Sequence, residues 1–130
     1  MINDSVKIKD AYIINITCNF DIIVLPNFNN NTVILNCINE LTQYFNIDNW
    51  NINQPILLNS LSILLDKVEG VQTVKNVKIN SISGASLGYS DYSYDLKAAT
   101  NNGIIYPSVD PMVFELKYPQ SDITGRVVPL

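Results

Sequence analysis

The stretch LNSLSILLDKVEGVQTVKNVKI, residues 58–79, decides the fold, because a helix with a start and a stop signal leads directly into a strand. Asn59 or Ser60 can cap the helix, since a short polar side chain accepts hydrogen bonds from first-turn amides. Gly70 closes it, since glycine adopts the left-handed conformation at little steric cost. Residues 71–77 then change to β-branched strand chemistry. Between the two signals runs one apolar stripe at helical spacing, formed by Leu61, Leu64, Leu65 and Val68. No side chain in this stretch is suited to catalysis.

Upstream, residues 10–25 alternate between apolar and mixed positions. A strict period of two over this length predicts a half-buried strand, or two strands joined by a bend near Asn19. The face expected to point into the core contains Tyr12, Ile14, Ile16, Cys18, Phe20 and Ile22. Residues 32–45 follow as a predicted helix, with Asn31 or Thr32 as cap. Its expected inner face is formed by Ile34, Ile38, Leu41 and Phe45.

The second half of the chain contains fewer regular patterns. Residues 80–102 are rich in Tyr, Gly and Ser and predict a long loop, with Ser83–Gly88 as its mobile tip. Residues 104–106 and 112–118 predict short strands, and 120–130 a tail. The whole pattern predicts a single α+β domain over residues 1–130, with two helices packed on a small, mostly antiparallel sheet.

Composition excludes several classes of function. The chain has 130 residues, of which 47% are hydrophobic, and its net charge of −4 includes only eight Lys and Arg. So few cations argue against binding a nucleic-acid backbone. The sequence contains no histidine and no apolar run long enough for a membrane span. Cys18 and Cys37 are expected to be buried, reduced thiols rather than a disulfide. We expect no cofactor, no metal and no small-molecule substrate.

Two patterns resemble catalytic chemistry. Residues 84–88 match the formula G-x-S-x-G, with Ser86 as the nucleophile, but that motif needs a histidine base and a following helix. Asp91, Asp95 and Asp110 offer carboxylates, and Asp91 with Asp95 could share a helical face. Their spacing fits no calcium loop, so solvated or turn-capping acids are the favoured interpretation. A hydrolase using Ser86 or the Asp91/Asp95 pair remains the least favoured hypothesis.

The aromatic residues are a better lead. Tyrosine combines apolar area with a polar tip and is enriched at contact surfaces. Trp50, Tyr89, Tyr92 and Tyr94 are therefore candidate interface residues, unless these rings, with Tyr106, merely cover the edge of a small core. A different hypothesis is a small binding module that captures a carbohydrate or peptide with the Tyr-rich loop. Arg126 is expected to form a structural ion pair with a carboxylate.

Beyond these patterns, an ordered series of short segments resembles the C-terminal domain of phage baseplate wedge proteins, the J-like baseplate subunits of T-even-like contractile tails. The resemblance covers about residue 10 to the terminus. Its centre is the helix–Gly–strand element ending in Val68–Val74. Around it lie Tyr44-Phe45, Ile47, Trp50–Ile56, Tyr106–Pro111, Phe114-Glu115, Lys117–Pro119 and Asp122–Val127.

This resemblance implies a structural virion protein without enzymatic activity. It implies self-association, as a dimer or other homo-oligomer, and contacts with other baseplate proteins in the ring around the tail hub. The implied location is the tail baseplate, with the host cytoplasm during assembly. Wedge subunits are several times longer than 130 residues. The chain is therefore expected to be either an excised C-terminal domain or a short homologue. The family provides no catalytic or ligand-binding residues to assign.

Overall fold

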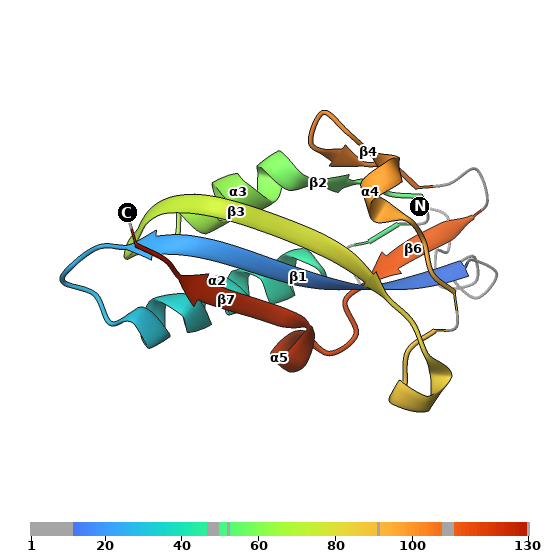
Figure 1. Cartoon of the computed structure of the whole chain (residues 1–130), viewed down its shortest axis with the longest axis horizontal. Helices are drawn as coiled ribbons and strands as arrows, with labels where there is room; N and C mark the ends of the chain where they lie inside the picture. The colour runs from blue at the N-terminus through green and yellow to red at the C-terminus, as the bar shows by residue number, and fades with distance from the viewer. Residues whose placement is uncertain (1–11, 47–49, 52, 91, 108–110, 130) are drawn as a thin grey trace.

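The computed structural model describes residues 12–46, 50–51, 53–90, 92–107 and 111–129, and these form an α+β fold, which confirms the predicted class (Figure 1). A four-stranded main sheet has helices packed on one face, and a small sheet of three short strands lies beside it. The strands are β1 (Tyr12–Val24), β2 (Ile56–Leu57), β3 (Val71–Ile82), β4 (Thr100–Asn101), β5 (Ile104–Ile105), β6 (Met112–Glu115) and β7 (Ile123–Val127). The helices are α2 (Asn30–Tyr44), α3 (Leu58–Asp66), the 3-10 turn η2 (Ala85–Leu87), α4 (Leu96–Ala99) and α5 (Pro119–Asp122).

Strand β1 is the centre of the main sheet. On one side it pairs antiparallel with β3 along residues 15–24. On its other side β6 pairs with residues 12–15 and β7 with residues 18–22, and both run parallel to β1. The main sheet is therefore mixed, although its longest pairing and the whole of the small sheet, ordered β2-β5-β4, are antiparallel as expected.

The predicted inner face of β1 is confirmed for five of its six residues. Ile14, Ile16, Cys18, Phe20 and Ile22 are all buried, whereas Tyr12 is 43% exposed at the start of the strand. The strand continues through Asn19, so the alternative of two strands with a bend does not apply. Helix α3 packs on β3 and α2 on β7, and together they cover the apolar face of the sheet.

Helix α2 begins earlier and is rotated relative to the prediction. Its cap is Asn29, whose Oδ1 accepts a hydrogen bond from the Thr32 amide at 3.1 Å, rather than Asn31 or Thr32. The expected residues Leu41 and Phe45 are buried, but Ile34 and Ile38 are only half-buried. The centre of the buried face is instead occupied by Val33, Cys37 and Leu41. The rotation follows from packing at the helix start, where Val33 lies against the Gly70 turn.

The segment around α3 agrees with the prediction only in part: the helix ends at Asp66, before Val68, and Gly70 lies in the turn that leads into β3. Gly70 has φ of +96°, the left-handed conformation expected, and β3 begins at the next residue. The predicted caps Asn59 and Ser60 are wrong, because the helix starts at Leu58 without a side-chain cap. The Leu58 amide donates instead to the carbonyl of Gly103 at 2.8 Å. A backbone acceptor from the small sheet therefore replaces the polar cap.

The segment predicted as a C-terminal tail contains strand β7. Its Gly125 lies opposite Phe20 of β1, so close that an added Cβ would overlap the aromatic ring. The predicted ion pair of Arg126 is confirmed: Nε and the terminal nitrogen Nη2 each lie 3.2 Å from a carboxylate oxygen of Asp21, also on β1. Because the Arg126 side chain is 73% exposed, this pair adds little stability and mainly fixes the register of β7.

We expect Gly125→Ala to destabilise the protein by about 1–3 kcal/mol, because the methyl group forces Phe20 out of its packed position. Urea unfolding measures the change. The double variant Gly125→Ala with Phe20→Leu should be less destabilised than the sum of the two single changes, because the smaller side chain relieves the overlap. An unfolding free energy unchanged by Gly125→Ala would contradict the close packing.

Both cysteines are free and buried, as predicted. Burial raises the pKa of the Cys18 thiol to about 12. Burial, and to a smaller extent the charge of Glu40, raises the pKa of the Cys37 thiol to about 11. Since the thiolate is the reactive form, a thiol reagent such as DTNB should modify neither residue in the folded protein at neutral pH. Both should react after unfolding in denaturant, and a fast reaction of the native protein would contradict their placement.

Candidate functional site

The candidate site is the tyrosine loop, by which we mean residues 83–90 and 92–95 between β3 and α4. Its tip, Ser83–Gly88, is a hydrogen-bonded turn. The Gly84 amide donates to the Ser90 carbonyl at 3.0 Å, and the Tyr89 amide donates to the Gly84 carbonyl at 3.1 Å. The 3-10 turn η2 lies inside this closed loop.

Tyr89 anchors the loop to helix α5. Its hydroxyl donates a hydrogen bond of 2.7 Å to Oδ1 of Asp122, which is only 5% exposed. The second carboxylate oxygen accepts from the Tyr118 amide at 3.3 Å, and the Tyr118 ring meets Tyr89 edge-on at 5.3 Å. The hydrogen bond to Asp122 raises the pKa of Tyr89, because it needs the protonated phenol. Tyr89 is therefore primarily a structural residue.

Two further contacts hold the loop to the rest of the domain. The buried Asn15 of β1 accepts from the Ser90 amide at 2.7 Å and donates from Nδ2 to Oε1 of Glu115 on β6, also at 2.7 Å. From the segment between β6 and α5, the Lys117 ammonium donates to the Gly88 carbonyl. Asn15 and Asp122 are the buried polar residues of the described chain, and both accept hydrogen bonds from residues of this loop.

Tyr94 is the third anchor. Its amide donates to Oγ of Ser81 at 3.3 Å, and its hydroxyl donates to the carbonyl of Tyr106 at 2.9 Å. Its ring lies 6.2 Å from that of Phe114 in the core. Tyr94 therefore joins the end of β3 to the segment after β5, and most of its bonding capacity is used within the chain.

Tyr92 is the loop tyrosine that faces outward. It is 52% exposed and meets Tyr12 edge-on, with ring centroids 4.7 Å apart. We call these two residues the tyrosine pair. Tyr12 was predicted to belong to the core face of β1, and its exposure corrects that prediction; at the start of the strand its ring packs against the loop. Of the four candidate interface residues, Tyr92 is the one with a large free surface.

Trp50 belongs to the core of this chain. It is 2% exposed, and its ring stacks on Phe45 with an interplanar angle of 11° and centroids 5.6 Å apart. The indole N–H donates to the Tyr44 carbonyl at 2.9 Å. An alanine at this position would open a cavity in the core and report on folding rather than on a surface contact.

The patterns that resemble catalytic chemistry have structural roles or are exposed. Ser86 is exposed in η2, a single 3-10 turn, and not on a strand-to-helix elbow. Asp95 caps α4 by accepting from the Ala98 amide at 3.1 Å, in agreement with the predicted turn-capping role. Asp91 and Asp110 lie outside the described residues. Within the described part of the chain, no cluster of three or more Cys, Asp or Glu side chains could hold a metal ion.

None of the helices in the described ranges is long and apolar enough to cross a membrane.

We expect Tyr89→Phe to lower the urea midpoint, because the buried Asp122 carboxylate loses a donor. Tyr92→Phe, which removes an exposed hydroxyl, is the matched control. The raised pKa of Tyr89 determines how the stability contributed by its hydrogen bond changes with pH. Its contribution to stability is fully present below the ordinary value of 10.0 and is lost as pH rises through the folded-state pKa. The difference in stability between wild type and Tyr89→Phe should therefore shrink at alkaline pH. A difference independent of pH there would contradict the hydrogen bond.

No protein-family model matches the sequence, and no curated protein matches it significantly.

Proposed function

We propose that this chain is a structural component of a contractile phage tail baseplate wedge, acting through self-association and contacts with neighbouring baseplate subunits. The observation that carries the assembly role is the exposed tyrosine pair, Tyr12 and Tyr92, presented by a loop that is fixed to the domain. Large amphipathic rings at the surface are the side chains that protein–protein contacts favour. The wedge identity rests on the sequence resemblance alone.

The anchoring of the loop supports this role energetically. Association loses affinity when a loop must be ordered at the interface. Tyr89, Ser90 and Tyr94 already bind the loop to Asp122, Asn15 and the Tyr106 carbonyl in the isolated chain. The tyrosine pair is therefore preorganised, so that its burial against a partner contributes more fully to affinity.

A ring of subunits also needs a second surface, because a closed pair uses one surface only. A groove of about 720 Å³ between α2 and α5 offers exposed apolar area at a different place on the domain. Leu35, which is 58% exposed, and Tyr118, which is 40% exposed, line it. This groove is our candidate for the contact with a neighbouring baseplate protein.

The second candidate function is a small peptide-binding or carbohydrate-binding module. The observation that favours it is a groove of about 730 Å³ beside α4, to which the tyrosine loop contributes Tyr94. Tyr92 does not line this groove. The exposed tyrosine therefore favours assembly, and the groove favours the binding of a peptide.

Tyr12→Ala and Tyr92→Ala should each weaken self-association about tenfold or more, a loss of about 1.4 kcal/mol, since each removes a ring from the contact. Multi-angle light scattering over a concentration series measures the molar mass against the 14.6 kDa of one chain. Ile63→Ala is the control, because Ile63 is 57% exposed on α3 and outside the tyrosine pair. A mass that stays at one chain at every concentration, or that neither tyrosine variant changes, would contradict self-association.

The baseplate assignment has its own measurement. Mass spectrometry of purified tails from the phage that encodes this sequence should detect the chain in the baseplate fraction, together with wedge proteins. Its absence from assembled baseplates would overturn the baseplate assignment. It would leave the self-association result standing, so the two parts of the proposal are separable.

A further inference from the structure

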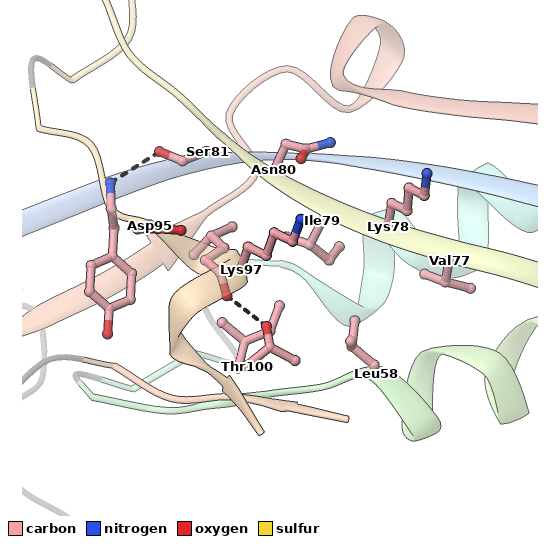
Figure 2. Close-up of a pocket in the computed structure, with 12 residues that line it drawn as sticks. Leu58, Val77, Lys78, Ile79, Asn80, Ser81, Asp95, Lys97 and Thr100 are labelled. Atoms are coloured by element: carbon pink, nitrogen blue, oxygen red, sulfur yellow. Dashed lines mark hydrogen bonds between the residues drawn. The ribbon is translucent and has the colours of Figure 1, made fainter. Parts of the chain in front are cut away.

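The groove beside α4 follows the free edge of strand β3. Figure 2 shows β3 crossing above α4, with Ile79 and Lys97 between them. Five consecutive residues of the strand, 77–81, form one wall of the groove. The apolar lining comes from four different elements and consists of Leu58, Val77, Ile79, Leu96 and Ile105. The groove therefore has the shape of a channel along a strand rather than of a round pocket.

The backbone of β3 is available on this side. The strand pairs with β1 on one side, and no other strand in the described ranges pairs with it on the opposite side. In an antiparallel pair, every second residue directs its N–H and C=O away from the partner strand. Such an edge can accept a further strand, which is how several domains bind extended peptides.

We propose that this groove binds an extended acidic segment of a partner protein, which adds a strand to the edge of β3. This site is distinct from the tyrosine pair and does not depend on self-association. Alternate side chains of the added strand would face the apolar lining, and those between them would lie on the outer face of the sheet, as Lys78 does.

Charge selects an acidic partner. Lys78 and Lys97 line the groove, and Lys75 lies on the same strand, so the local charge is positive although the chain carries −4. Lys97 extends from α4 toward β3 (Figure 2). The acidic residue of the described lining is Asp95, and its carboxylate already caps α4. An acidic segment would therefore meet two positive charges, and the cap that Asp95 forms on α4 would stay in place.

The same lysines disfavour a second copy of the chain as the occupant. The charged residues of β3 are Lys75 and Lys78. Antiparallel pairing of two β3 edges would bring the lysines of both copies together, and some registers place Lys75 directly opposite Lys78, or Lys78 opposite itself. Like charges directly opposite each other destabilise a strand pair, and lysine on an edge prevents edge-to-edge association.

The probe is a fluorescein-labelled seven-residue peptide in which Val alternates with Asp or Glu, followed by fluorescence anisotropy. A matched peptide with Lys in place of the acidic residues should bind at least about tenfold more weakly, since charge reversal adds like-charge repulsion. Two further versions carry N-methyl groups on one or the other alternate set of amides. One of them should lose binding and the other retain it, because only one set faces the β3 edge.

The groove is tested by charge reversal on the protein. Lys97→Glu and Lys78→Glu should each weaken the acidic peptide about tenfold, by the same like-charge repulsion. Lys67→Glu makes the same change of charge between α2 and α3, away from the groove, and should leave binding unchanged. In amide NMR spectra of the wild type, the peptide should shift the signals of residues 77–81.

Several results would overturn the proposal. The first is that the acidic peptide does not bind, and the second is that the lysine peptide binds as tightly as the acidic one. The third is that Lys67→Glu weakens binding of the acidic peptide as much as Lys97→Glu or Lys78→Glu does. Shifts that cluster away from β3 would also overturn it. Dimerisation that the peptide inhibits would identify a second copy as the occupant and reject the acidic partner. Tyr92→Ala should retain peptide binding, so failure of the assembly proposal is distinguishable from failure of this one.

Discussion

The structure depends on one constraint: β1 pairs with all the remaining strands of the described main sheet, which are β3, β6 and β7. The strand has 13 residues, long enough for β6 to pair with its first four and β7 with a later run of five on the same side. Its apolar face, from Ile14 to Ile22, is covered by α2 and α3. Its opposite face contains the groups that hold the loop and β7, Asn15 and Asp21. One strand thus organises the core and positions the candidate site.

The sequence predicted the parts of the fold that depend on local pattern. A period of two identified the buried face of β1, and Gly70 marked the left-handed turn before β3, because that backbone conformation is a property of glycine. The cap of α3 was not predictable in this way, since its partner is the Gly103 carbonyl, 45 positions along the chain from Leu58. Strand β7 was also missed. Its glycine makes it a poor strand by composition, and only the Phe20 ring opposite explains why a glycine is needed there.

The candidate site shows the same division. Composition correctly drew attention to the tyrosines, but it does not give the direction of a ring. Tyr89 points inward because Asp122 accepts from it 33 residues away, and Tyr94 because the Tyr106 carbonyl does so 12 residues away. Tyr92 lies between these two anchors and is left exposed, with Tyr12 as its neighbour. Trp50 was assigned to the same group by residue type, yet its stacking on Phe45 makes it part of the core.

The two proposed contact surfaces are connected through the tyrosine loop. Tyr94 contacts Ser81 at one end of the β3 groove, and two residues before it Tyr92 forms the tyrosine pair. A strand added beside residues 77–81 would therefore lie next to the segment that contains Tyr92 and Tyr94. Because the groove is locally positive while the chain as a whole carries −4, an acidic segment would be guided to this edge rather than to the rest of the surface. In the proposed assembly, the groove and the tyrosine pair would thus bind two different partners at neighbouring places on the domain.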